Sequence, residues 1–537
     1  MNEKKYIVTT ALFYANGPLH LGHMLEMIQA DIWVRSARER GYNVIFLSGD
    51  DQHGTPIMLQ AEKLGQSPEQ MIDAVHQDHL RDIESFHISY DCFYGTHNQE
   101  TKQVVNDIYH KVTPYLTETV IEQAYDPVKQ VFLPDRYIKG QCPKCGAKDQ
   151  YGDNCEVCGA TYTIDDLVNP YSILTGQTPE KRATPHQFFD LKPLTQVISS
   201  WQENATIAKN IQNKLTEWMD DLRPWDITRD GPYFGFEIPG RDNQYFYVWL
   251  DAPIGYLGIL SHYLKGDPYT LWDDESSHIM HFIGKDIINF HGLFWPGVLN
   301  AAGHSLPNEI RTHGFLTING QKMSKSRGTY ISAAHFNQSI PTEYLRYYLA
   351  SKLTNSTDDM DFSLEDFKNR VNAELIGKII NLGNRCVGIL TKHFDGQLLE
   401  ISIEDEIWRD SIVHAEKIRP LWLSGDYQSA MRSVIIWVNH INQYVDTHKP
   451  WAAVKIEEEK PNAHQVCSMG FNLFFRIMRE IACVLPKTFE KLNLSINENQ
   501  SDGMVLPAQK IENYPRLLER ITDEQIESLL TENAAQR

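Results

Sequence analysis

Two short motifs, around 300 residues apart, contain side chains that suit phosphate binding. The first is His20-Leu21-Gly22-His23, which follows a β-branched run and begins a segment of helix-forming composition. Free backbone N–H groups at a helix start attract anions, and the i, i+3 spacing puts both imidazoles on one face. Gly22 leaves room for a flat base to approach. Taken alone, the tetrapeptide is equally compatible with two ordinary surface or capping histidines.

The second motif is the basic loop KMSKSRG at residues 322–328, which follows the turn Asn319-Gly320. Its cations and hydroxyls suit a triphosphate, and lysines on a closing loop can stabilise charge that develops on pyrophosphate during in-line attack. A solvated basic loop is the alternative for this segment alone. The two motifs together predict nucleotide chemistry, with Mg²⁺ accompanying ATP.

Four of the eight cysteines, Cys142, Cys145, Cys155 and Cys158, form two CxxC knuckles within one short stretch. Four thiolates at this spacing fill the tetrahedral shell of zinc and leave no position for water, so we expect one structural Zn²⁺ ion. Its binding energy would fold a small module. Free thiols or a redox pair are the alternative.

Length and composition predict a multidomain cytoplasmic protein. A chain of 537 residues exceeds the size of one hydrophobic core, so we expect two to four domains. No stretch approaches the roughly 20 apolar residues of a membrane span, and the first residues are unlike a signal peptide. Because the formal charge is -20, any nucleic-acid site must be local rather than spread over the surface.

The order of the predicted elements indicates an α/β fold. A strand at 6–12, a helix at 20–40 and a strand at 44–47 predict a Rossmann-type parallel sheet, and the aromatic run 245–250 also has strand-like composition. We expect a split catalytic domain (1–96 and 243–315), an insertion (97–242) with the knuckles at 142–158, and a linking region (316–370). Long amphipathic segments predict an all-α bundle over 371–537.

The two phosphate motifs resemble the HIGH and KMSKS signatures of class I aminoacyl-tRNA synthetases, the first with leucine in place of isoleucine. The segments ALFY (11–14), DDQHGTP (50–56), WLDAPIGY (249–256), FIGKD (282–286) and HGLFWP (291–296) are similar to the methionyl-tRNA synthetases of that class. The likeness covers most of the chain. It implies an AMP-forming ligase that makes methionyl-adenylate and passes methionine to the 3′-terminal adenosine of initiator and elongator tRNA(Met).

The resemblance also implies roles for individual residues. At ATP it places His20, Gly22, His23, Asp286, Lys322, Ser324 and Lys325, of which the two histidines and two lysines act in catalysis. Around methionine it places Leu12, Tyr14, Trp249, Pro253, Tyr256, Ile287, His291 and Trp295, with Asp51 holding the ammonium group. At the CAU anticodon it places Asn381, Arg385 and Trp451. Without the resemblance, the aromatic run would be core packing and the face with Arg385 a solvated surface.

Two other functions remain open at this stage. One is a synthetase for another apolar amino acid, because one methylene gives only about 1–3 kcal/mol of discrimination. The other is a noncatalytic tRNA-binding or zinc-ribbon module. We expect a monomer, since the chain ends soon after the predicted bundle.

Overall fold

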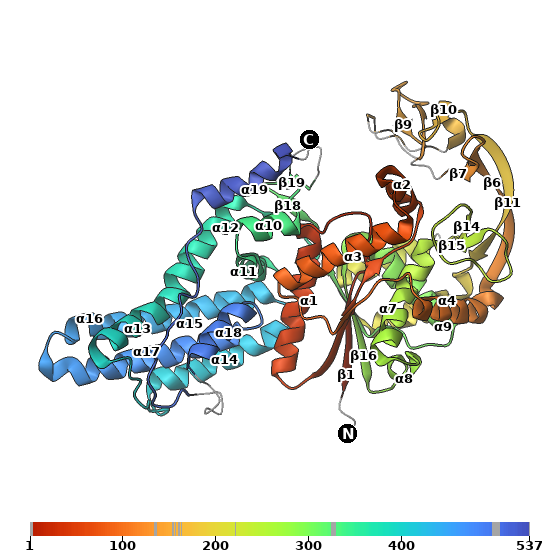
Figure 1. The fold of residues 1–537 in the computed structure, drawn as a ribbon. Helices are drawn as coiled ribbons and strands as arrows, with labels where there is room; N and C mark the ends of the chain where they lie inside the picture. The colour runs from red at the N-terminus through yellow and green to blue at the C-terminus, as the bar shows by residue number, and fades with distance from the viewer. Residues whose placement is uncertain are drawn as a thin grey trace.

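A six-stranded parallel sheet lies at the centre of the molecule (Figure 1). In the computed structural model, which describes residues 4–133, 137–152, 155, 157, 158, 160, 162, 164–220, 222–323, 329–496 and 505–535, the central strand is β1 (Lys5–Thr10). It pairs with β3 (Asn43–Ser48) on one side and β16 (Ser277–Gly284) on the other. The outer strands are β5 (Cys92–Phe93), β17 (Glu309–His313) and β12 (Thr206–Ile207). The predicted parallel sheet is confirmed.

Helices cover both faces of this sheet. Consecutive residues of a strand face opposite sides, and Val8 packs in the hydrophobic cluster of α1 (Leu21–Glu39) while Ile7 packs in that of α7 (Val248–Leu264). The strand expected at 245–250 is wrong in its second half, because β15 (Gln244–Phe246) ends before α7 begins. A helix buried on nearly all sides has the same apolar composition as a buried strand.

An antiparallel ribbon extends from the core and carries the cysteine module. Strands β6 (Leu116–Asp126) and β11 (Glu180–Phe189) form the arch in Figure 1, with β8 (Ile138–Gln141), β9 (Gln150–Tyr151) and β10 (Val168–Ser172) at its far end. Residues 97–242 also give the core a helix, α4 (Gln99–Val112), and the edge strand β12. The domain boundaries stay a prediction.

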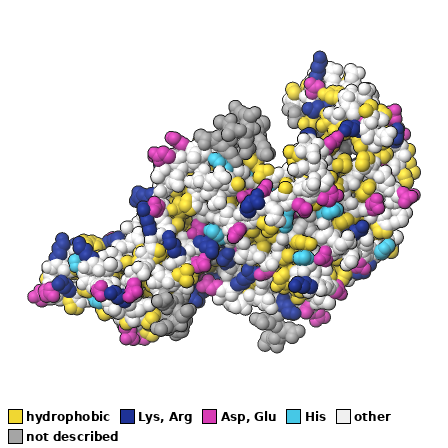
Figure 2. Space-filling view, viewed as in Figure 1, with side chains coloured by type: hydrophobic (Ala, Val, Ile, Leu, Met, Phe, Trp, Pro, Cys, Tyr) yellow, Lys and Arg dark blue, Asp and Glu magenta, His cyan; other side chains and the backbone are white. Residues whose placement is uncertain are grey.

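The C-terminal region is helical, as predicted. A continuous helix runs through α12 (Leu364–Arg370), the π-helical segment η7 (Val371–Ile380) and α13 (Asn381–Phe394). It packs with α15 (Tyr427–His448) and α17 (Lys460–Glu480), and α14 (Glu406–Ser424) packs on α15. Acidic and basic side chains are interspersed on the bundle (Figure 2). Among the described helices, none combines the length and apolar character needed to cross a membrane.

The bundle and the sheet domain share one hydrophobic core. It runs from α1 through α11 (Thr342–Lys352) into α13, α15 and α17. A buried ion pair lies at this junction, with Arg346 Nη2 2.6 Å from Asp31 Oδ2. The same guanidinium donates to the carbonyl oxygens of Phe86, Cys483 and Val484, so its hydrogen bonds join three parts of the chain.

Candidate active site and metal centre

A cavity of about 1200 Å³ lies beyond the carboxyl ends of the central strands, where parallel sheets commonly bind ligands. Its walls come from the segments after β1, β3 and β16, from α7, from the ribbon and its module (121–181) and from residues 226–233. Eight of the nine residues predicted around methionine line it: Leu12, Tyr14, Asp51, Trp249, Pro253, Tyr256, Ile287 and His291. The ninth, Trp295, is buried behind the wall, with its ring centroid 6.4 Å from that of Tyr256.

Two buried carboxyl groups, one that lines the cavity and one on α7 that does not, each have an oxygen without a hydrogen-bond partner among the described residues. These atoms are Oδ1 of Asp51 and Oδ1 of Asp251. Burial, followed by the nearby charge of Asp251, raises the pKa of Asp51 well above its usual range. The second oxygen of Asp251 lies 2.7 Å from His53 Nδ1. Buried polar atoms are nearly always bonded, so the Asp51 oxygen indicates a site for a cation or donor.

Another part of the cavity wall is aromatic and contains a neutral histidine. Tyr256 Oη lies 2.9 Å from His291 Nε2, and burial lowers the pKa of His291 to about 4. His291 belongs to a single π-helical segment, η6 (Phe290–Phe294), a geometry frequent at functional sites. Trp249 stacks on Phe290 with ring centroids 4.0 Å apart. This wall suits a polarizable apolar side chain.

The histidine motif forms the start of α1, as predicted. Nδ1 of His20 accepts the Gly22 N–H at 3.0 Å, and Nδ1 of His23 accepts the His20 N–H at 3.3 Å. The two rings stack with centroids 3.7 Å apart. Burial lowers the pKa of His23 well below its usual range, so its ring is neutral and Nε2–H is the donor.

The basic loop begins beside this helix start. Lys322 ends β19 (Gln321–Lys322), whereas Ser324 and Lys325 lie outside the described residues. A Cβ atom at Gly22 would be 2.7 Å from Met323 Cε, so Met323 covers that glycine. After the loop, the carbonyl of Ile331 accepts the Leu21 N–H at 3.2 Å. Residues before and after the loop therefore both lie against the histidine motif.

We expect Gly22→Ala to raise the KM for ATP about tenfold without loss of folding. The new Cβ would meet Met323 Cε at 2.7 Å and the His20 ring at 2.9 Å, so both groups must shift where a nucleotide would lie. Steady-state kinetics and thermal unfolding measure the two effects. Gly17→Ala is the control because its Cβ would meet nothing within 4 Å. Equal kinetics for both variants would contradict this assignment.

The four cysteines of the knuckles converge at the end of the ribbon. Their Sγ atoms all lie within 4.8 Å of one another, with Cys142 to Cys158 at 3.8 Å and Cys145 to Cys155 at 3.6 Å. A tetrahedron with metal–sulfur bonds of about 2.3 Å has edges of about 3.8 Å, so the four sulfurs fit one ion. Cys142 Sγ also accepts the Lys144 N–H at 3.4 Å, which orients the thiolate.

The predicted anticodon residues lie on the helical bundle. The guanidinium of Arg385 lies 5.0 Å from the ring centroid of Trp451, a residue that is 42% exposed. Arg385 also pairs with Asp446 at 2.5 Å. Asn381 is exposed one turn earlier on α13. The structure thus brings Arg385 and Trp451 into contact, with Asn381 next to them along the helix.

Asp286, a predicted site residue, lies outside the cavity, and two further residues were not predicted. Asp286 is exposed in the turn after β16 and does not line the cavity. Sequence reasoning missed Arg229, whose guanidinium lies 3.6 Å from the Tyr247 ring centroid in the cavity wall, and it missed Asp251. Asp251 stands within the WLDAPIGY segment, so its acidic character inside an apolar run was the available signal. No local sequence pattern marked Arg229 as a site residue.

Comparison with known proteins gives concordant results. The sequence model of the family described as "tRNA synthetases class I (M)" matches residues 6–387. Similar solved structures include two complexes of Mycobacterium tuberculosis methionyl-tRNA synthetase with methionyl-adenylate. Both have a TM-score of 0.75; identities are 22% and 23%, covering 95% and 96% of this chain and 100% of each of those chains. The apo form of that enzyme has a TM-score of 0.71 and 21% identity, and the match covers 97% of this chain and 99% of that chain. At these identities the likeness shows a shared fold.

Proposed function

This chain belongs to the class I tRNA synthetases (M), and from that premise we propose that it activates L-methionine with ATP and transfers it to tRNA(Met). The observation that carries the proposal is the Asp51 oxygen that has no hydrogen-bond partner among the described residues, in a cavity with aromatic walls. A carboxylate can pair with the substrate ammonium group, while the walls of Tyr256 and Trp249 surround an apolar thioether. Both halves of a methionine molecule therefore find a suitable surface.

In the first step the methionine carboxylate attacks the α-phosphorus of ATP in line, and pyrophosphate leaves. His20 and His23 donate hydrogen bonds to phosphate oxygens, Lys322 and Lys325 stabilise the leaving pyrophosphate, and Asp286 contacts the nucleotide. Mg²⁺ accompanies ATP. In the second step the terminal ribose hydroxyl of tRNA attacks the mixed anhydride, which releases AMP. The protein positions reactants and forms no covalent intermediate.

We assign one structural Zn²⁺ to the four cysteines and anticodon reading to the bundle. Zinc suits four thiolates in a closed tetrahedron, whereas a catalytic ion would need an open position. Asn381, Arg385 and Trp451 would contact the CAU anticodon through hydrogen bonds and stacking. A cytoplasmic monomer acting on both initiator and elongator tRNA(Met) completes the proposal.

We expect Trp451→Ala to raise the KM for tRNA about 10- to 100-fold, because stacking on an aromatic ring is worth about 1–3 kcal/mol per base. Methionine-dependent exchange of pyrophosphate into ATP, which needs no anticodon, should be unchanged. Aminoacylation and exchange assays separate the two effects. Ile436→Ala, also exposed on the bundle, is the control. An unchanged tRNA KM would remove Trp451 from the recognition surface.

The experiment that tests the whole proposal is exchange of labelled pyrophosphate into ATP with methionine, run beside the other apolar amino acids. Exchange with methionine alone supports both adenylation and substrate. Exchange with another amino acid keeps the mechanism and changes the substrate. If no amino acid supports exchange, with or without tRNA, the chain is a noncatalytic tRNA-binding module.

A further inference from the structure

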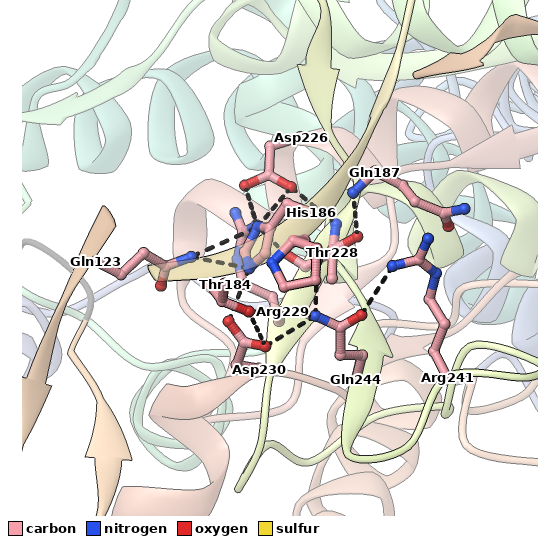
Figure 3. A network of polar contacts seen from close by, with 11 residues as sticks. Gln123, Thr184, His186, Gln187, Asp226, Thr228, Arg229, Asp230, Arg241 and Gln244 are labelled. Atoms are coloured by element: carbon pink, nitrogen blue, oxygen red, sulfur yellow. Dashed lines mark hydrogen bonds and ion pairs between the residues drawn. The ribbon is translucent and has the colours of Figure 1, made fainter. Parts of the chain in front are cut away.

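A buried histidine lies between two carboxylates at the root of the ribbon (Figure 3). His186 of β11 has no exposed surface. Its Nδ1 is 2.8 Å from Asp226 Oδ2 and its Nε2 is 2.8 Å from Asp230 Oδ2. Asp226 belongs to β13 (Trp225–Asp226) and Asp230 to β14 (Thr228–Asp230), so one ring joins three strands.

This geometry favours a charged ring. A carboxylate oxygen accepts, so both ring nitrogens must carry protons, which describes an imidazolium. Burial opposes the charge, but the hydrogen bonds to Asp226 and Asp230 outweigh it and raise the pKa of His186. Gln123 of β6 contacts the ring as well, with the nitrogen of its side-chain amide 2.9 Å from His186 Nε2. Turning this amide over, a choice that the hydrogen bonding decides, places its oxygen beside the Nε2–H.

One of the two carboxylates, Asp226, also contacts a cation in the cavity wall. Arg229 Nη1 is 3.4 Å from Asp226 Oδ2 and donates to the Thr228 carbonyl at 2.5 Å, while its guanidinium packs on the Tyr247 ring. Asp226, Arg229 and Asp230 all line the cavity. The position of Arg229 therefore depends on where Asp226 and β14 are held.

We propose that His186 is a positioning residue, a buried imidazolium that holds Asp226 and Asp230 in place and thereby fixes the Arg229 guanidinium at the cavity wall. A fixed guanidinium determines where an anionic group of the substrate is attracted. Without the imidazolium, Asp226 and Asp230 lose the cation that they share. Asp226 then competes with the anionic group of the substrate for the Arg229 guanidinium. The proposal rests on the proposed function, because it concerns binding of an amino acid and ATP in this cavity.

The direction of the pH dependence follows from the groups that face His186. These are Asp226 of β13, Asp230 and Arg229 of β14, and the neutral Gln123 of β6; Arg241 and Glu118 form the next ion pair outward. Because the pKa of His186 is raised on folding, its contribution to stability is full below about pH 6.5 and is lost as pH rises through the folded pKa. Positioning of Arg229 should be lost over the same pH range.

The test uses His186→Gln in the full chain, with exposed His110→Gln as control. At pH 7 we expect kcat/KM for methionine in the exchange assay to fall about tenfold. The wild type should lose kcat/KM as pH rises through the His186 pKa, and the variant should lack that limb. In an Arg229→Gln background the His186 substitution should have little further effect, because the two act as a unit.

A milder variant covers the case in which His186→Gln does not fold. Asp230→Asn keeps the histidine and removes one carboxylate, so the alkaline limb should move to lower pH. An unchanged limb in either variant, or independent effects of His186→Gln and Arg229→Gln, would overturn the proposal.

Thermal unfolding separates this proposal from the proposed function. The difference in Tm between wild type and His186→Gln should be largest below about pH 6.5 and shrink as pH rises. Absence of methionine-dependent exchange in the wild type would refute the proposed function alone. A Tm difference that does not change with pH would refute the imidazolium whether or not exchange is observed.

Discussion

In an Asp51→Asn variant, kcat/KM for methionine in the exchange assay should fall about 100-fold or more. Removing one partner of a buried charge pair costs about 2–5 kcal/mol, and the Asp51 oxygen has no other described partner to offset the loss. Asparagine keeps the shape of the side chain and removes its charge. Most of the loss should appear as a higher KM for methionine, since the ammonium group is remote from the reacting carboxylate.

The control for this variant is Asp165→Asn at the outer part of the same cavity, where the side chain is exposed and paired with Lys181 at 2.7 Å. Equal losses in the two variants would show that Asp51 is not the ammonium site. The pH profile adds a second check. Because the pKa of Asp51 is raised, methionine binding should improve as pH rises through that pKa, and the asparagine variant should lack this limb.

The second large effect concerns the metal. Replacing Cys155 with serine should abolish stoichiometric metal binding and unfold the knuckle module, because binding of a structural zinc is worth about 10–16 kcal/mol of folding free energy. Elemental analysis and limited proteolysis measure the two effects, and new cleavage should fall between β8 and β10. Chelation of the wild type should give the same fragments.

Cys92→Ser is the matched control for that experiment, since Cys92 lies in β5, outside the cluster. It should keep its full metal content. A Cys155→Ser protein that retains one ion per chain would contradict the four-thiolate site. Loss of metal with an intact proteolysis pattern would show instead that the module folds without it.

Features with a local sequence signal were predictable. Short β-branched and apolar runs ended by turn residues predicted β1 and β3, and recurring apolar positions predicted α1. The CxxC spacing predicted that four sulfurs would meet. The start of α7 was missed because apolar composition does not separate a buried helix from a buried strand. The roles of all the residues in the phosphate motifs stay predictions, and Ser324 and Lys325 lie outside the described residues.

Features built from distant contacts left no such signal. His186 meets Asp226 and Asp230 only because β11, β13 and β14 lie together, and pairings of this kind depend on the whole fold. The contact of Met323 with Gly22 joins residues from the two ends of the catalytic region. By contrast, eight predicted cavity residues converge because each follows a central strand or lies on α7, positions that the resemblance had already supplied.

The core shared by the sheet domain and the bundle has a mechanical consequence. Since α1, α11 and α17 pack in one apolar interior closed by Arg346 and Asp31, bending between the two parts would break that interior. The surface at Trp451 and the cavity at Asp51 are therefore held at a set separation. Under the proposed function, a tRNA that reaches both places must match this fixed distance, so we expect the overall shape of the tRNA to contribute to its selection.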